Sequence, residues 1–158
     1  MLKEIRMNYS LKEEEVTISL INEMLPLLEE HRLEISAFTD MRLNPCVEQY
    51  VTLYAMGMYK VYVARDNTNK IIAYAGYFVQ PNFHYQDYTY ATQDVVYVQK
   101  TRRGAMMGSR LLGFADEQLQ LFGVDVVTHH VKVKQDFGVL LQRLGYKWIE
   151  KIYMKRLK

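Results

Sequence analysis

The stretch Asp94–Leu112 reads DVVYVQKTRRGAMMGSRLL, and it decides how the chain folds. It begins with a β-branched apolar run, Val95–Val98, which is typical of a buried strand. A short basic loop follows, and a turn from Gly104 to Gly108 then opens an amphipathic helix. The first N–H groups of a helix have no intrahelical partner, and the helix dipole adds partial positive charge there. The sequence therefore predicts a site for a phosphate or pyrophosphate between the strand and the helix.

The basic loop strengthens this prediction. Lys100, Arg102 and Arg103 bring positive charge, and the two arginines can bind an anion through two donors at once. The two common nucleotide fingerprints, GxGxxG and GxxxxGK[ST], are both missing around Gly104 and Gly108. An ordinary strand-loop-helix with a polar turn is the competing interpretation, and this segment alone leaves both open.

The composition is that of an ordinary globular protein. The chain has 158 residues, of which 49% are hydrophobic and 24% charged, and its net charge is +2. So small a charge excludes a dominant attraction to nucleic acid or to membranes. The single cysteine, Cys46, excludes an internal disulfide, favours a reducing cytoplasm and is expected to be a small buried residue. We expect neither a signal peptide nor a transmembrane segment.

Hydrophobic periodicity and turn residues predict a single α/β domain over residues 1–158. The predicted elements are an edge strand or lead-in at Met1–Tyr9, a helix at Leu11–Glu34 that kinks or restarts at Pro26, a helix starting at Asn44-Pro45, strands at Val61–Arg65, Ile71–Val79 and Thr89–Val98, the motif helix ending at Phe122, a strand at Val124–Val131, a helix at Lys134–Leu144 and a strand at Tyr146–Leu157. The strand-helix-strand unit around the motif should be a right-handed crossover between parallel neighbours. A mixed, mostly antiparallel sheet flanked by helices follows.

The opening stretch resembles motif A of the GNAT acetyltransferase superfamily. That motif runs hydrophobic-x-V, a short loop, R/Q-x-x-G-x-G/A, and then a helix with Leu-Leu. The matching residues are Val96, Val98, Arg103, Gly108, Leu111 and Leu112. One departure is plain, because Met106 stands where the family has its first glycine.

A second run, Lys134–Tyr146, resembles the family pattern N-x-x-A-x-x-L-Y-x-K-x-G-F. The fitting residues are Leu140, Arg143, Gly145 and Tyr146. Leu141 stands where the family usually has tyrosine. The order of the predicted elements is also the GNAT order over essentially the whole chain. A narrower resemblance, to short GNAT proteins of tailed bacteriophages and prophages, rests on the segments around His84-Tyr85, Asp94 and His129–Lys132.

The resemblance implies a GNAT fold with splayed central parallel strands and an acetyl-CoA-dependent N-acyltransferase, in which an amine attacks the thioester directly in a ternary complex. The pantetheine arm would lie along the end of the strand Thr89–Val98, where it splays from Val124–Val131. An N–H of Val98 would polarise the thioester carbonyl. The cofactor-binding residues implied are Val96, Tyr97, Val98, Arg102, Arg103, Gly104, Ala105, Met106, Met107, Gly108 and Ser109.

An attacking amine must first lose a proton, so the reaction needs a base. Asp94 is the first candidate, because without a bulge it would share a strand face with Val96 and Val98. An aspartate that only hydrogen-bonds its neighbours is the competing interpretation. His129 and His130 are the next candidates, and strand alternation lets at most one of them point into the cleft.

The acid and the acceptor site are less determined. Leu141 cannot protonate the leaving thiolate, so Tyr146, a water or no acid at all remain open. His84 and Tyr85 lie in an aromatic loop that would wall the acceptor site or simply be exposed. The acceptor amine could be a lysine side chain, a protein N-terminus, a polyamine, an aminoglycoside or a small metabolite.

Three further expectations concern partners. A GNAT-fold module that binds CoA or a protein without turnover is the second hypothesis, supported by Met106 and Leu141. Nucleic-acid binding is a third hypothesis. It would use the C-terminal cations Lys147, Lys151, Lys155, Arg156 and Lys158. A solvated final strand and tail is the favoured interpretation of the same charges. We expect no metal, because the adjacent pair His129-His130 lacks ligand spacing, and a homodimer through an edge strand is plausible in this fold.

Overall fold

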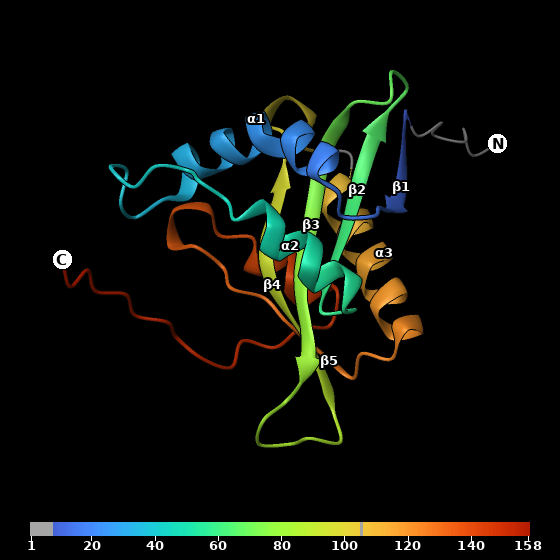
Figure 1. The fold of residues 1–158 in the computed structure, drawn as a ribbon, viewed down its shortest axis with the longest axis vertical. Coiled ribbons are helices and arrows are strands. Elements are labelled where there is room, and N and C mark those ends of the chain that lie inside the picture. The colour runs from blue at the N-terminus through green and yellow to red at the C-terminus, as the bar shows by residue number, and fades with distance from the viewer. Residues whose placement is uncertain (1–7, 105) are drawn as a thin grey trace.

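A five-stranded sheet in the order β1-β2-β3-β4-β5 forms the centre of the computed structural model, which describes residues 8–104 and 106–158 (Figure 1). The strands are β1 (Tyr9–Glu13), β2 (Tyr59–Asp66), β3 (Ile71–Pro81), β4 (Thr89–Val98) and β5 (Val126–Thr128). The first four strands pair antiparallel, whereas β4 and β5 pair parallel through a helical crossover. The predicted mixed, mostly antiparallel α/β sheet is confirmed.

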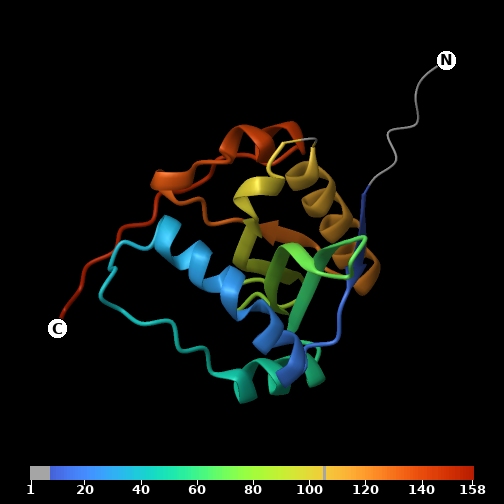
Figure 2. The ribbon, with the colours of Figure 1, turned by 90° about the horizontal axis from the view of Figure 1, so that it is seen from above.

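Helices cover both faces of the sheet (Figure 2). One face carries α1 (Ile18–Ile35) and α2 (Val47–Ala55), and the other carries α3 (Met107–Phe122) and α4 (Gly138–Arg143). Two apolar layers result, because strand side chains alternate between the faces. The layer under α1 contains Leu20, Met24, Val63 and Tyr74, and the layer under α3 contains Tyr62, Tyr77, Leu111 and Leu119.

The helix of the motif has the predicted limits and the predicted apolar face. The stripe Met107, Leu111, Ala115 and Leu119 is buried against the sheet. The helix ends at Gly123, whose φ of 102° is left-handed and favours glycine. The side chain of Asp66 shapes the hairpin turn after β2, since it accepts hydrogen bonds from Thr68 and from the backbone of Lys70.

The N-terminal prediction was wrong in its limits. The helix begins at Ile18 after the cap Thr17, whose side chain accepts from the N–H of Leu20 at 3.1 Å. Leu11 belongs to β1, because pairing with β2 supplies backbone hydrogen bonds that helix periodicity cannot reveal. The helix also runs through Pro26 without restarting, since its buried face holds it on the sheet. Of the strand predicted at Met1–Tyr9, residues 1–7 lie outside the described part of the chain.

The predicted start of the second helix was also wrong. Helix α2 begins at Val47, and Asn44 and Pro45 lie in the preceding loop. Pro45 instead lines an apolar cavity under α1. Cys46, expected to be buried, is exposed and unpaired.

The C-terminal part departs most from the prediction. β5 covers only Val126–Thr128, and the helix predicted at Lys134–Leu144 is divided into a 3₁₀ turn, Val133–Gln135, and α4. Among the described residues after Gly145 there is no helix or strand, so the strand predicted at Tyr146–Leu157 is absent. A strand needs a neighbour, and the short β5 offers little edge for pairing. The exposed tail leads away from the sheet (Figure 1).

Candidate active site

The two parallel strands separate part-way along β4. β5 pairs with Tyr90–Thr92 only, and β4 then continues to Val98 alone on that side. The N–H of Gln99 donates to the carbonyl of Ile72 in β3 at 2.9 Å. Because ladder bonds alternate along an antiparallel pair, the backbone groups of Val96 and Val98 face away from β3. An open backbone edge therefore leads from the centre of the sheet to the motif turn.

Gln93 bridges the gap at the point where the strands part. Its Oε1 lies 2.7 Å from Nδ1 of His129, and its Nε2 donates to the carbonyl oxygen of His130 at 3.4 Å. An amide oxygen only accepts, so Nδ1 of His129 carries the proton. Nε2 of His129 is then an acceptor, and it is buried without a hydrogen-bond partner among the described residues. Burial lowers the pKa of His129 to about 4, so the imidazole is neutral near pH 7.

Asp94 lies on a β-bulge, which overturns the expected strand face. Val95 pairs with Gly76 and Gln93 with Tyr77, so Asp94 is the extra residue of β4. The bulge places Asp94 beside Val95 on the α1 side of the sheet, whereas Val96 packs on the α3 side. The prediction that Asp94 shares a face with Val96 and Val98 is therefore wrong.

Two phenols hold the carboxylate of Asp94. The hydroxyls of Tyr50 and Tyr59 both donate to Oδ2, each at 2.9 Å. Burial raises the pKa of Asp94, and the two hydrogen bonds oppose that rise. Gly76 makes this arrangement possible, because a Cβ there would collide with the hydroxyl of Tyr59. A base with a raised pKa beside a cavity is what proton removal near neutral pH requires.

The motif turn combines left-handed residues with the first N–H groups of α3. Gly104 has φ 104° and Met106 has φ 63°, so Met106 adopts the conformation that a glycine would take without strain. The N–H groups of Gly108 and Ser109 lie in the first turn of α3, where a helix offers them no acceptor. A Cβ on Gly108 would lie 3.3 Å from Leu140, so this glycine lets α4 pack over the turn. Ala105 lies outside the described residues.

No protein-family profile matches the chain, and no curated protein does. Solved structures do match. An aminoglycoside acetyltransferase from an uncultured soil metagenomic sample, in complex with trehalose, shares 17% identity, covers 98% of this chain and 100% of its own, and has a TM-score of 0.75. Glucosamine-6-phosphate N-acetyltransferase from Arabidopsis thaliana shares 16%, covers 94% and 99%, and has a TM-score of 0.71. A predicted acetyltransferase with acetyl-CoA, from Clostridium acetobutylicum, shares 13%, covers 94% and 96%, and has a TM-score of 0.62.

This chain has the GNAT fold. The whole GNAT element order is present up to α4, as the motif resemblance predicted. The separation of β4 from β5 is the predicted splay of the central parallel strands.

In this GNAT fold the cations of the motif loop are engaged with carboxylates. Arg103 donates to the carbonyl of Val98 at 3.0 Å and pairs with Glu34 at 2.8 Å, which lowers the pKa of Glu34. Lys100 lies 3.7 Å from Glu34, and Arg102 lies 3.3 Å from Asp66. The arginines therefore fix the loop against α1 and β2. In the first turn of α3, the N–H of Met107 donates to the carbonyl of Gly104, whereas the N–H of Gly108 has no acceptor among the described residues and is available to an anion.

The other predicted cofactor residues divide between the two faces of the GNAT sheet. The ring of Tyr97 is buried on the α1 side and stacks on His31, with ring centroids 4.9 Å apart. Met107, the first residue of α3, is buried against the sheet, and Met106 is exposed at the turn. Only the backbone of these three residues is thus available to a bound nucleotide, apart from the thioether of Met106.

Of the predicted candidates, His129 and Tyr146 lie together, whereas the side chain of His130 lies apart from them. His129 lies in an aromatic enclosure, with the ring of Tyr146 5.0 Å away and that of Tyr77 5.6 Å away. The hydroxyl of Tyr146 donates to Asp116 at 2.6 Å, and burial raises the pKa of Tyr146. This bond holds the carboxylate of Asp116 beside the ring of Tyr146. His130 is exposed, in keeping with the prediction that one histidine at most enters the cleft.

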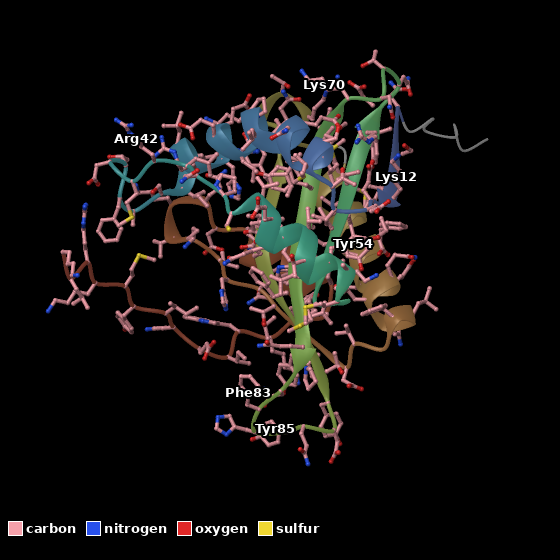
Figure 3. The ribbon with its side chains drawn as sticks, viewed as in Figure 1. Lys12, Arg42, Tyr54, Lys70, Phe83 and Tyr85 are labelled. Atoms are coloured by element: carbon pink, nitrogen blue, oxygen red, sulfur yellow. The ribbon has the colours of Figure 1, made fainter. Side chains whose placement is uncertain are left out.

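The aromatic loop lies apart from this cluster. His84 and Tyr85 are in the hairpin between β3 and β4, at the end of the sheet opposite to the motif turn (Figure 3). Their backbone N–H groups donate to the side chain of Asn82, which shapes the turn. Both side chains are exposed.

Sequence reasoning missed four contributors to the site: Tyr50, Tyr59, Gln93 and Asp116. The composition carried one signal, the abundance of tyrosine between residues 50 and 97. The bulge that selects Tyr50 and Tyr59 leaves no pattern in the sequence.

Two observations bound the site further. In residues 8–104 and 106–158, no helix is long and apolar enough to cross a membrane. Within the same ranges, no three His, Cys, Asp or Glu side chains gather as metal ligands.

Proposed function

We propose that this chain is an N-acetyltransferase that moves an acetyl group from acetyl-CoA to a primary amine. The observation that carries the proposal is the open edge of β4, which leads directly to the N-terminus of α3. An extended chain with amide groups, ending in a pyrophosphate, is complementary to such an edge followed by a helix N-terminus. The similarity to structures of acetyltransferases supports the same proposal.

Each part of the edge has a proposed role. The backbone groups of Val96 and the N–H of Val98 pair with the pantetheine amides or polarise the thioester carbonyl, since the carbonyl of Val98 already accepts from Arg103. The amides of Gly108 and Ser109 bind the pyrophosphate. Arg102 and Arg103 hold the loop in place and add positive potential.

Asp94 is the proposed base. It takes one proton from the acceptor ammonium, so that the neutral nitrogen attacks the thioester carbonyl carbon. The C–N bond forms, the C–S bond breaks, and the electron pair leaves on the sulfur of CoA. The nitrogen loses a second proton as the amide forms. One proton ends on the thiolate and the other goes to solvent, which balances the reaction.

His129 and Tyr146 have a secondary role in this proposal. Nε2 of His129 is an unpartnered acceptor in the strand gap and offers a second base for the same proton. Tyr146 is the proposed donor to the leaving thiolate, but its proton is already engaged with Asp116. A water therefore serves equally well as the acid, and Asp94 remains the first candidate base.

Ser109→Glu tests the phosphate site without harming the fold. The added carboxylate lies in the first turn of α3, where it stabilises the helix dipole but repels a pyrophosphate. We expect CoA affinity, measured by isothermal titration, to fall by about tenfold or more, with Tm unchanged or higher. Gln120→Glu, an exposed position near the other end of α3, is the matched control and should leave CoA affinity unchanged. Equal affinity in both variants would place the pyrophosphate elsewhere.

A binding module without turnover is the second candidate function. Met106 at a strained turn position and Leu141, buried in place of the family tyrosine, favour it. The two functions differ in a single assay, in which acetyl-CoA is mixed with the protein and a panel of amines. CoA binding without acetylated product from any amine would support the binding module.

We also propose that the protein is cytoplasmic, for which its single cysteine is the support. A homodimer is a further part of the proposal. Among the described strands, β5 pairs on one side only. The tail after Tyr146 exposes several large apolar side chains, Trp148, Ile149, Ile152 and Tyr153. An edge strand and an exposed apolar tail both favour self-association. Sedimentation velocity should show a dimer that Ile149→Lys weakens.

A further inference from the structure

The cavity beside Asp94 combines hydrocarbon walls with one carboxylate. Its volume is about 120 Å³, and it lies between α1, the loop of residues 36–46 and the sheet. Leu20 and Met24 of α1 and Val61 of β2 form apolar walls, and Asp94 is the one charged residue that lines it. An apolar cavity of about 150 Å³ can hold a benzene molecule. The space therefore suits a ring or a short unbranched hydrocarbon.

The carboxylate offers one uncommitted oxygen to this space. Tyr50 and Tyr59 both donate to Oδ2 of Asp94, and no side chain in the described ranges donates to Oδ1. The rings of the same tyrosines lie edge to face, with centroids 4.9 Å apart. Aromatic faces attract a cation, and a carboxylate oxygen accepts its hydrogen bonds. A single ammonium group meets both demands.

A second cavity adjoins this site. It has a volume of about 200 Å³ and shares Pro45 and Tyr50 with the first cavity. Cys46 and Gln49, which also line it, are exposed. Tyr50 of α2 thus lines both spaces, and the second cavity lies on the exposed side of the site.

We propose that the acceptor is a primary amine carried on a single apolar body, such as an alkylamine or an arylalkylamine. The inference rests on the proposed acetyltransferase function and names its substrate class. The ammonium group would lie at Oδ1 of Asp94 and the hydrocarbon would fill the cavity. Asp94 is also at the start of the open edge of β4, which places the nitrogen near the proposed thioester position.

The same cavity disfavours polycations and phosphosugars. Each further ammonium of a polyamine or aminoglycoside would need its own carboxylate, since a buried unpaired charge is costly. A phosphate placed here would meet the negative charge of Asp94. Acceptors with several charges or with a phosphate are thus poor matches to these walls.

A chain-length series tests the proposal. Full-length protein and acetyl-CoA are mixed with ethylamine, propylamine, butylamine, pentylamine, 2-phenylethylamine, spermidine or kanamycin, and the acetylated amine is quantified by mass spectrometry. Each buried methylene should raise kcat/KM by about fourfold until the cavity is full. Spermidine and kanamycin should be at least about tenfold poorer than pentylamine. A flat chain-length series, or a preference for either polycation, would overturn the substrate class and leave the transferase function standing.

A substitution that fills the cavity can be compared with a matched control on the same loop. Leu43 lines the cavity from the loop and is only partly buried, so Leu43→Trp should fill the space without disturbing the core. We expect the KM for pentylamine to rise by about tenfold or more. Met41→Trp, on the same loop but exposed and outside the cavity lining, should leave KM unchanged. Equal effects of the two variants would overturn the assignment of the cavity.

Binding measured without acetyl-CoA separates the two proposals. Saturation-transfer NMR should detect pentylamine on the protein, and Leu43→Trp should abolish the signal. If pentylamine binds in this way but no amine is acetylated, the cavity assignment stands and the transferase function fails. If no pentylamine signal appears while another amine is acetylated, the cavity assignment fails and the transferase function stands.

Discussion

The carboxylate of Asp94 is stabilised by two phenols and destabilised by its burial. Because its pKa is raised in the folded protein, the folded state holds the proton more tightly than the unfolded state does. The stabilising effect is complete below the unfolded pKa and is lost as the pH rises through the folded pKa. The ionised group therefore lowers stability near pH 7. A destabilising buried charge is typical of a catalytic position.

Asp94→Asn should separate activity from stability. The amide keeps the shape of the side chain but cannot take a proton, so kcat should fall by about 100-fold or more. The Tm at pH 7 should rise, because the buried charge is removed. CoA affinity by isothermal titration is the control and should not change. Retained activity would assign the base to His129 or to water.

Met106 holds the left-handed conformation of the motif turn without being a glycine. A non-glycine residue pays about 1 kcal/mol for this conformation, and the side chain is 67% exposed, so it gains little from packing. Met106→Gly should therefore increase the free energy of unfolding by up to about 1 kcal/mol in urea titrations. Gly104→Ala, at φ 104°, should decrease it. A loss of stability in Met106→Gly would show that the turn is not left-handed there.

At the scale of the elements, the bulge of β4 depends on residues from three strands. Tyr59 on β2 reaches across the space left by Gly76 on β3 to bond Asp94 on β4. The missing side chain of Gly76 is therefore as necessary as the hydroxyl it admits. The bulge also sends Asp94 and Val95 to one face of the sheet, which opens the cavity side to a charged group.

Gly76→Ala should break this arrangement. The added methyl collides with the hydroxyl of Tyr59, so the free energy of unfolding should fall by about 1 to 3 kcal/mol. Tyr59→Phe removes the hydroxyl and should recover part of that loss in the double variant. Gly113→Ala is the control, because a Cβ there meets nothing within 4 Å, and it should stabilise α3. The absence of recovery in the double variant would argue against the bulge geometry.

At the scale of the whole molecule, the buried His31 and the half-buried His129 lie on opposite faces of the sheet. His31 bonds Tyr74 at 3.1 Å under α1, and His129 bonds Gln93 on the α3 side. Burial lowers the pKa of each to about 4. Unfolding lets both take up a proton at a higher pH, so the unfolded state binds more protons between about pH 6.5 and pH 4. Acid should therefore unfold both layers together.

Stability should fall as the pH drops from about 6.5 to 4, by a few kcal/mol for the two histidines together. Urea midpoints at several pH values measure this. His31→Gln and His129→Gln should each flatten the dependence, whereas His130→Gln, at an exposed position, should leave it unchanged. If stability falls as steeply with pH in His31→Gln and in His129→Gln as in the unchanged protein, the carboxylates account for the acid sensitivity.

The sequence by itself determined those elements whose residues are adjacent in the chain. The β-branched run ending at Val98, the apolar stripe of α3 and the stop at Gly123 depend on neighbours in sequence, and the chain alone predicts them. The same motif residues predicted the GNAT fold, because strand, turn and helix are contiguous there. Domain extent, the phage resemblance and the nucleic-acid alternative stay predictions from the sequence.

Tertiary structure alone decided which side chains meet. The bulge at Asp94 depends on pairing with β3, and the partners Tyr50 and Tyr59 come from elements far away in the chain. The carboxylates that bind the loop arginines likewise come from α1 and β2. The tail after Tyr146 has the composition of a strand but finds no partner edge among the described strands. Sequence patterns encode which face is apolar, whereas register, bulges and strand partners are fixed by long-range contacts that no local pattern contains.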